Sequence, residues 1–289
     1  YDNLHLADTA PLALSRPYEA QERDLKDRFP DEAEAIEAWT AALRAGREVM
    51  YSIASTRAMP DFVGHMIEWW NHRAINKWCA RTTQEVVDSI TQNKDLAAAF
   101  TAQWGDHGGR PKKASFAMHA LVCGSFLESG AWYPVGGGKA FAEHLVPTIT
   151  QAGGEARAGV KVDKLLVEKN GVVGVRTSEG EEIRSDVVIS NIGARETVNH
   201  LLPAGFGPED WIGKIQALPA SIAHFNLFLG FEGDVKEAGA TRSNHWIYPT
   251  GEVDVMWTDA PEGDPPGIFV SFASLKDPSH DPGPKQKYA

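Results

Sequence analysis

The sequence predicts a mixed α/β fold organised as three consecutive segments. Apolar residues recur at helical spacing through most of the first 130 residues, which predicts a mainly helical segment over residues 1–132. Residues 133–203 combine a helix, a β-meander and a continuous apolar run, an order typical of part of an α/β domain. Short β-rich runs after residue 203 predict a mostly antiparallel sheet over residues 204–289.

The helices of the first segment follow from the spacing of apolar side chains. Residues 31–50 place Ile36, Trp39 and Leu43 at i, i+3 and i+7, after a Phe-Pro-Asp start signal. Residues 59–101 show similar spacing and predict further helices. A Gly- and Pro-rich loop at residues 105–113 follows, and another helix is expected over residues 114–127.

The second segment changes from helical to β periodicity. Residues 139–152 predict a helix, and Gly153-Gly154 stands where a helix C-cap needs positive φ. The β-rich runs that follow are separated by Asn170-Gly171, a strong hairpin signal, and then by Glu179-Gly180. Residues 186–190 hold a continuous apolar run between polar residues. We expect this run to be a strand covered on both faces within a parallel sheet.

The third segment carries a weaker pattern. Strands are expected within residues 222–231 and over residues 246–248, 253–257 and 267–272. From Lys276 onward, Asp-Pro and Gly-Pro pairs predict a loop.

Composition excludes some partners. Acidic residues outnumber basic ones by 39 to 28, and the net charge of −11 opposes non-specific binding to nucleic-acid phosphates. Cys79 and Cys123 lack the spacing of a zinc site or a disulfide framework, which favours a reducing, cytoplasmic setting. The apolar runs are shorter than the roughly 20 residues of a membrane span. The first residue is Tyr1, with no charged-then-apolar signal segment before it, and the natural N-terminus is expected to be missing.

Two turns rich in small residues are the candidate cofactor contacts. Residues 136–139, Gly-Gly-Gly-Lys, lack the flanking residues of a phosphate-binding P-loop, yet they let a flat group approach the start of a helix. Residues 190–194 follow the apolar run, and ligands gather at the carboxyl ends of strands in α/β sheets. A plain tight turn and an Asn-capped strand-to-helix turn are the alternative interpretations.

Metal-dependent and hydrolytic chemistry find no support in the motifs. The H-x-x-x-H, paired-carboxylate and G-x-S-x-G patterns are absent, and no metal ligands are predicted. His119 and His144 lie on predicted helices, where a hydrogen-bonded structural histidine is commoner than a catalytic one. The nine tryptophans fit either a cavity for a long apolar ligand or, more commonly, ordinary core packing.

Several short motifs occur in order along the chain: Tyr133-Pro134-x-Gly136-Gly137, His144-x-x-Pro147, Gly153-Gly154, Val162-x-Lys164-Leu165, Gly174-Val175, Val188-Ile189-Ser190-Asn191 and Leu201-Leu202-Pro203. Together they resemble the phytoene desaturase and retinol saturase family of FAD-dependent oxidoreductases. Three further motifs resemble the retinol saturase branch: Gly105-Asp106-x-Gly108, Ser115-Phe116-x-Met118-His119-Ala120 and Ser271-Phe272-x-Ser274-Leu275-Lys276-Asp277-Pro278.

The resemblance implies an FAD/NAD(P)-binding Rossmann-like domain interleaved with a substrate-binding domain, made here of the helical segment and the mostly antiparallel sheet. The chain is then expected to be a fragment that holds the middle FAD segment and lacks the two outer ones. In that arrangement the Val162 main chain pairs with the adenine edge. The residues expected near the pyrophosphate and ribityl side are Ser190, Asn191 and Gly193, and those expected to face the flavin and the substrate are Gly136 and Gly137.

The resemblance also implies a reaction. Flavin N5 exchanges hydride with a carbon–carbon double bond of a polyene or isoprenoid lipid, with FAD as cofactor and NAD(P) as a redox partner. For a proton donor the candidates are Tyr133, His119 and His144, in that order. An apolar substrate favours peripheral membrane contact, and the fragment is expected to be inactive alone. Two alternatives stay open: a non-catalytic isoprenoid-binding escort protein on the same scaffold, and a flavin amine oxidase.

Overall fold

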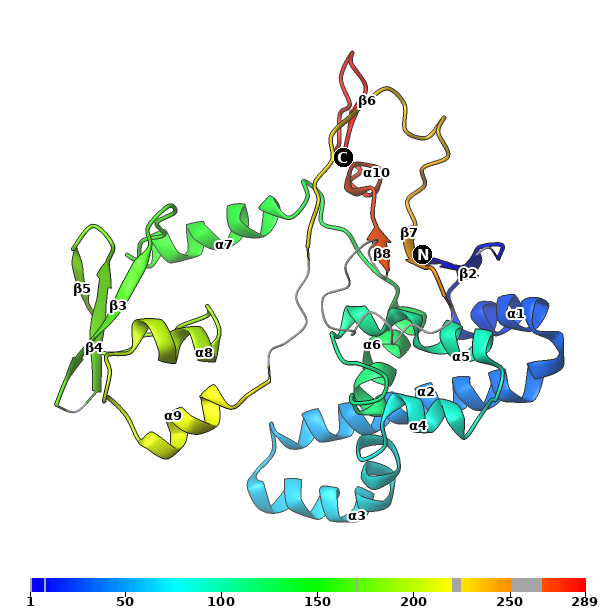
Figure 1. Cartoon of the computed structure of the whole chain (residues 1–289), viewed down its shortest axis with the longest axis horizontal. Helices are drawn as coiled ribbons and strands as arrows, with labels where there is room; N and C mark the ends of the chain where they lie inside the picture. The colour runs from blue at the N-terminus through cyan, green and yellow to red at the C-terminus, as the bar shows by residue number, and fades with distance from the viewer. Residues whose placement is uncertain (1, 8, 170, 220–224, 251–266) are drawn as a thin grey trace. The chain divides into compact units, whose positions relative to one another are not determined.

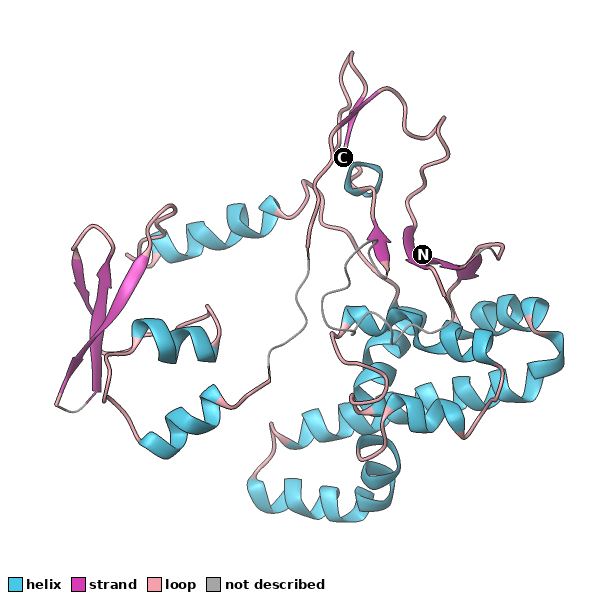
Figure 2. Cartoon of the chain, viewed as in Figure 1, coloured by secondary structure: helices cyan, strands magenta, loops and turns pink. Residues whose placement is uncertain are grey.

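The computed structural model describes residues 2–7, 9–169, 171–219, 225–250 and 267–289 (Figure 1). By their internal contacts they form two compact units. Unit 1 comprises Tyr1–Ala140 and Phe225–Ala289, and unit 2 comprises Phe141–His224. Each unit contains both helices and strands (Figure 2), so the predicted mixed α/β class is confirmed.

Helices make up most of the first 130 residues, as the apolar spacing predicts. The longest, α2 (Ala33–Thr56), buries the predicted residues Ile36, Trp39 and Leu43. Helix α6 (Phe116–Ser129) packs along α2 at Gly46, where an added Cβ would lie 2.8 Å from the Ala120 side chain. Also helical are α1 (Tyr18–Arg28), α3 (Asp61–Cys79), α4 (Thr83–Asp88) and α5 (Lys94–Thr101), with 3-10 turns at η1 (Pro30–Glu32) and η2 (Ala102–Asp106).

An aromatic cluster holds these helices together. The Trp39 ring stacks on Phe100 with centroids 4.5 Å apart and meets the edge of Phe116 at 5.5 Å. All three side chains are buried, and burying such a side chain contributes roughly 1.5–3 kcal/mol. The contacts therefore fix α2 against both α5 and α6.

The sheet of unit 1 joins the two ends of the chain. Its order is β2-β1-β7-β8, with β1 (Asp2–Leu6) parallel to β7 (Asn244–Tyr248) and the other pairs antiparallel. The predicted strands at 246–248 and within 267–272 are confirmed as β7 and β8 (Ile268–Val270). The hairpin of β1 and β2 (Leu12–Leu14) was not predicted, because both strands are very short. A short helix, α10 (Ala273–Lys276), and the pair β6 (Phe231–Glu232) and β9 (Lys287–Tyr288) complete this region.

Unit 2 holds the predicted meander. Helix α7 (Lys139–Gln151) begins with the last two residues of the first stretch of unit 1, and its other residues belong to unit 2. Gly153 follows the helix with φ 82°, as expected of a glycine at a helix C-terminus. Strands β3 (Val162–Glu168), β4 (Gly171–Thr177) and β5 (Glu182–Arg184) form an antiparallel sheet in that order, as the predicted meander requires. Asn170, the first residue of the predicted Asn-Gly turn, lies outside the described residues. Helical residues follow as α8 (Ala194–Glu196), the π-helix η3 (Thr197–Leu201) and α9 (Glu209–Gln216).

The prediction of a buried parallel strand at residues 186–190 is wrong for this structure. The run has no strand hydrogen bonding among the described residues of unit 2, and the Ile189 side chain is 90% exposed. A continuous apolar run indicates a segment suited to burial, but a parallel strand also needs neighbours on its edges. Likewise, residues 225–230 are not a strand, and the strand expected at 253–257 lies outside the described residues.

None of the described helices has both the length and the apolar character that crossing a bilayer requires.

Candidate functional site

The predicted site residues fall into two sets, one in each unit. In unit 1 the glycine turn, residues 133–138, leads directly into α7. Gly136 and Gly137 have φ of 84° and 73°, values that residues other than glycine rarely adopt. The Gly137 N–H donates to the Pro134 carbonyl at 3.0 Å, which closes the turn. The sequence therefore needs glycine at both positions for backbone reasons alone.

A distant carboxylate anchors the glycine turn. The Gly136 N–H donates to Asp277 Oδ1 at 3.1 Å, and the same oxygen accepts from the Ser279 hydroxyl at 2.7 Å and the Ser279 N–H at 2.9 Å. The Ser279 hydroxyl and then the Gly136 N–H lower the pKa of the Asp277 carboxyl. Asp277 belongs to one of the family-like motifs of the sequence, but no local sequence pattern indicates a contact between residues 141 positions apart.

The amide groups of the turn are used inside the protein. Because Gly136 donates to Asp277 and Gly137 to Pro134, neither N–H is free to bind a ligand. Space is available instead: no heavy atom lies within 4 Å of a Cβ added at Gly138. The exposed Tyr133 side chain lies close by, with its hydroxyl 3.8 Å from a Cβ added at Gly137. The arrangement suits a flat group lying against the turn rather than a phosphate held by its amides.

His119 lies in the core of unit 1, at one end of a chain of hydrogen bonds. Its Nε2 lies 3.0 Å from the Phe100 carbonyl oxygen, which can only accept, so Nε2 carries the proton. Its Nδ1 then accepts from His107 Nε2 at 3.0 Å, and His107 Nδ1 accepts from the Gly109 N–H. Burial and then the neighbouring His107 lower the pKa of His119 to about 3, against the weaker opposing effect of the Phe100 carbonyl.

The remaining proton-donor candidate has different surroundings. His144 is exposed on α7, in unit 2. The structure thus brings Tyr133 next to the glycine turn, places His119 inside the core, and leaves His144 on a helix surface.

In unit 2 the second set forms a corner, residues 190–194, that leads from an irregular segment into helical residues. Gly193 is the N-cap residue of α8 with φ 100°, and nothing lies within 4 Å of an added Cβ. The Ser190 and Thr197 hydroxyls are 2.6 Å apart, and the Thr197 hydroxyl donates to the Gly193 carbonyl at 2.8 Å. Asn191 is exposed and does not cap the helix, so the alternative of an Asn cap is wrong. The corner is an open surface of small residues.

Val162 begins β3, which packs against η3. It is half-buried and pairs with Thr177 on antiparallel β4, with a bulge before Lys164. In the described sheet β3 is an edge strand, since the order is β3-β4-β5.

A buried polar network under the sheet of unit 1 was not foreseen. The Asp2 carboxylate accepts from Gln103 Nε2 at 2.8 Å, Asn244 Nδ2 at 2.8 Å and Trp246 Nε1 at 2.9 Å. Lys276 Nζ donates to Asn244 and to Ser271, and burial lowers the pKa of Lys276. Because the donors come from distant segments, no local sequence pattern could identify this network.

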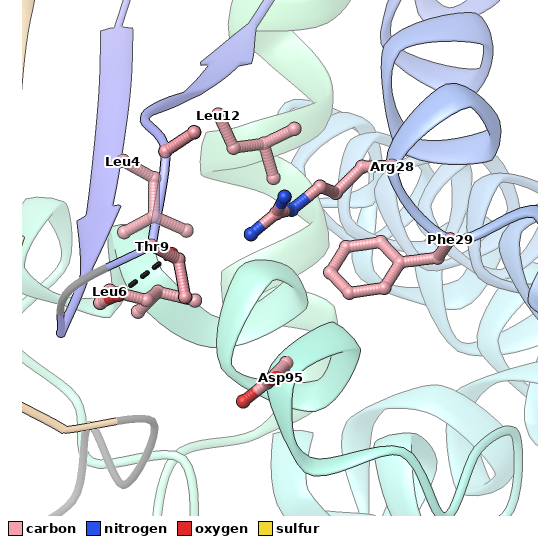
Figure 3. Close-up of a pocket in the computed structure, with 8 residues that line it drawn as sticks. Leu4, Leu6, Thr9, Leu12, Arg28, Phe29 and Asp95 are labelled. Carbon is pink, nitrogen blue, oxygen red and sulfur yellow. Dashed lines mark hydrogen bonds between the residues drawn. The ribbon is translucent and has the colours of Figure 1, made fainter.

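Among the described residues of unit 1, side chains line two hollows of different size. One, of about 10 Å³, has room for about one water molecule and is lined in part by Leu6, Thr9, Arg28, Phe29 and Asp95 (Figure 3). On its β1 side the Thr9 hydroxyl donates a hydrogen bond to the Leu6 carbonyl. The other is open, about 430 Å³, and is lined in part by Lys236, Arg242, Asp277 and His280. Among the described residues, no group of three or more His, Cys, Asp or Glu side chains could hold a metal ion.

Comparison with known proteins adds independent information. A family described as "Flavin containing amine oxidoreductase" matches residues 22–283. An all-trans-retinol 13,14-reductase from Danio rerio is 28% identical over 305 residues, covering 98% of this chain and 50% of the relative. An inactive all-trans-retinol 13,14-reductase from the same organism is 28% identical over 275 residues, 89% of this chain and 45% of the relative. A neurosporene-forming phytoene desaturase from Rhodobacter capsulatus is 36% identical over 96 residues, 33% of this chain and 18% of the relative. The chain spans about half the length, or less, of these curated relatives.

Proposed function

Because the chain belongs to the family of flavin-containing amine oxidoreductases, we propose that it is part of an FAD-dependent oxidoreductase acting on a carbon–carbon double bond of a polyene or isoprenoid lipid. The names of the relatives confirm the resemblance to retinol saturases and phytoene desaturases. The observation that carries the proposal is the match to an all-trans-retinol 13,14-reductase along 98% of the chain. The division into segments 1–132, 133–203 and 204–289 is our proposal for how substrate-binding and FAD-binding parts alternate.

The geometry of the glycine turn is compatible with this function. Bound FAD would supply hydride exchange between its N5 atom and a substrate carbon. Gly136 and Gly137 would give the flat ring system a surface without side chains. Their amides already have partners within the protein, so the contact would be made by the surface of the turn and not by its N–H groups. Asp277 would hold that surface in place. The role of the turn is then orientation of the reacting groups and exclusion of water.

Unit 2 would supply the other cofactor contacts. We assign Ser190, Asn191 and Gly193 to the pyrophosphate and ribityl side, because the corner exposes small and polar groups at the start of a helical segment. Val162 is assigned to the adenine edge, where a main-chain contact would use the outer edge of β3.

Tyr133 is our first choice for a proton donor. Its hydroxyl lies beside the glycine turn, so a substrate placed against that turn would be within its reach. The low pKa of His119 keeps its ring neutral at pH 7, and both ring nitrogens already have partners. These surroundings suit a structural role, and His119 and the exposed His144 rank behind Tyr133.

The partners follow from the same proposal. The substrate would be an apolar retinoid-like or carotenoid-like chain, NAD(P) is a proposed redox partner, and peripheral membrane contact would give access to a substrate that partitions into bilayers. We assign the protein to the cytoplasm, in agreement with the two free cysteines, Cys79 and Cys123.

A non-catalytic polyene-binding role is the second candidate. One relative of similar coverage is described as an inactive all-trans-retinol 13,14-reductase, so likeness across this region occurs without the activity. The two candidates differ in redox turnover and agree in ligand binding.

The test uses the full-length protein purified with its flavin. We expect a flavin absorption band that is bleached by a reductant and restored by a polyene substrate. The Tyr133→Phe variant should keep the flavin band but lower kcat by about 10²-fold if the phenol donates a proton. Tyr51→Phe, a change at an exposed tyrosine on α2, is the matched control. A flavin that is reduced but never reoxidised by any polyene would favour the binding role.

A further inference from the structure

Helix α3 (Asp61–Cys79) exposes a continuous apolar stripe. Phe62, Met66, Trp69 and Trp70 are 75%, 60%, 70% and 78% exposed, and their spacing of four, three and one residues puts them on one face. Met59, just before the helix, is exposed as well. Single exposed apolar side chains are ordinary, but adjoining tryptophans in such a stripe indicate an interaction surface.

The opposite face of α3 already has its partner. Asn71 Nδ2 donates to Ser52 Oγ of α2 at 3.2 Å, and the Thr56 hydroxyl lies 3.4 Å from Glu68 Oε1. Gly64 is buried, and an added Cβ there would be 3.2 Å from the Thr56 carbonyl. Trp78 packs on Phe116 of α6 with ring centroids 5.4 Å apart. Since α3 packs on α2 and α6 through this inner face, the stripe is not its packing face within unit 1.

The charge on the stripe differs from that of the chain. Arg73 and Lys77 continue the same face one and two turns beyond Trp69, at the C-terminal half of the helix. The two acidic residues of α3 lie off this face, Asp61 at the first position and Glu68 toward α2. The region 51–81 contains four Arg and Lys against two Asp and Glu, whereas the whole chain carries −11. A negatively charged partner therefore complements this surface.

We propose that α3 is a docking helix for the surface of an anionic lipid bilayer, with its aromatic half set among the headgroups and Arg73 and Lys77 at the lipid phosphates. Tryptophan suits this boundary because the ring is apolar while its N–H needs a polar partner. A helix with an apolar stripe and flanking cations binds in the plane of the interface without spanning it. The inference deepens the proposed function, because it names the surface through which a lipid-dissolved substrate would be approached.

The primary experiment measures vesicle binding by the full-length protein. Vesicles of phosphatidylcholine mixed with phosphatidylglycerol should bind the wild type more tightly than phosphatidylcholine alone. Trp69→Ser with Trp70→Ser should weaken binding by about tenfold or more, because the aromatic anchors are lost. Trp132→Ser with Trp211→Ser, an equal change at two exposed tryptophans outside α3, should leave binding unchanged. Equal losses in the two double variants would overturn the proposal.

A second pair of variants tests the electrostatic part. Arg73→Gln with Lys77→Gln should weaken binding to the anionic vesicles by about fivefold for each charge, with little effect on phosphatidylcholine. Lys94→Gln with Lys112→Gln is the control outside α3. If the α3 pair has no effect on the anionic vesicles, charge complementarity is refuted.

Other occupants of the stripe give different results. If it joins two copies, the tryptophan variant will change the oligomer in ultracentrifugation and not vesicle binding. If another part of the longer protein covers it, this chain will bind vesicles and the full-length protein will not. Either result overturns the proposal. Vesicle binding needs neither flavin nor turnover, so its failure leaves the proposed oxidoreductase function standing, and an inactive protein that still docks would refute only that function.

Discussion

Acidification should destabilise unit 1 through His119, because the folded protein keeps this ring neutral while the unfolded chain protonates it. The pKa of His119 is about 3 in the folded state and 6.5 in the unfolded reference. Since the folded pKa is the lower one, the unfolded state binds the extra proton between these values, and stability falls as the pH falls through 6.5. Between pH 7.5 and 4.5 the loss of stability from this one ring is about 3 kcal/mol.

The perturbation is His119→Gln, which removes the titrating ring and keeps a polar side chain. The variant will lose stability at every pH, since the bonds to Phe100 and His107 change. The informative quantity is therefore the difference in stability between pH 7.5 and pH 4.5, which should be smaller in the variant by about 3 kcal/mol. His144→Gln, a change at an exposed ring in unit 2, is the control and should match the wild type.

The assay is urea unfolding followed by tryptophan fluorescence. Eight of the nine tryptophans belong to the sequence of unit 1, so the signal reports mainly on that unit. If His119→Gln does not fold, ring NMR of the wild type replaces it, and the His119 signals should stay at their neutral positions down to pH 4.5. A variant that loses as much stability as the wild type, or a ring that titrates near 6.5, would refute the reasoning. Under the proposed function, a neutral His119 would also produce no limb near neutrality in the pH profile of the full-length protein's activity.

Three further predictions concern the scaffold. Asp277→Ala should weaken flavin retention by the full-length protein, because the Gly136 N–H loses its acceptor, and Asp277→Asn should weaken it less. Fluorescence of released FAD measures retention in both variants. Retention equal to that of the wild type in Asp277→Ala would exclude an anchoring role. Gly174→Val should destabilise the meander by about 3 kcal/mol or more, because φ is 151° and an added Cβ would lie 2.2 Å from the Ile183 carbonyl oxygen. Gly180→Ala, at a positive-φ site with open space around an added Cβ, should cost only about 1 kcal/mol. Urea unfolding followed by far-UV circular dichroism compares the two variants, and similar losses of stability would contradict the steric account. Asp2→Ala should cost about 3 kcal/mol, because the buried donors of Gln103 and Trp246 and the half-buried donor of Asn244 lose this acceptor. A loss below about 1 kcal/mol in the urea assay would mean that water replaces the carboxylate.

The local elements were predictable where one feature of the sequence is sufficient. The spacing of Ile36, Trp39 and Leu43 predicts the buried face of α2, and the Asn-Gly pair in the sequence predicts that β3 and β4 are antiparallel neighbours. The glycine turn and the corner at 190–194 were also located from small residues near element ends. Each of these features depends on residues only a few positions apart, so the local sequence is sufficient to predict where it occurs.

The candidate site was only partly predictable for the same reason. Tyr133, Gly136 and Gly137 belong to one short stretch of the sequence, residues 133–137, so their proximity follows from the chain itself. Asp277, which fixes the turn, lies 141 positions away, and its side chain looks like any other Asp before a Pro. The surroundings of His119 depend on Phe100 and on the loop of His107, so its helix position alone gave no measure of its pKa.

Local patterns of residues predict most of the helices and the meander of β3, β4 and β5, because 3.6- and 2-residue periodicities are short-range properties of the chain. How those segments are used depends on the tertiary structure. It paired β1 with β7 across about 240 positions, left the apolar run at 186–190 exposed, and turned the Gly64 face of α3 inward so that Trp69 and Trp70 face outward. An apolar side chain has no preferred partner in sequence, and only packing selects which of two suitable faces is buried.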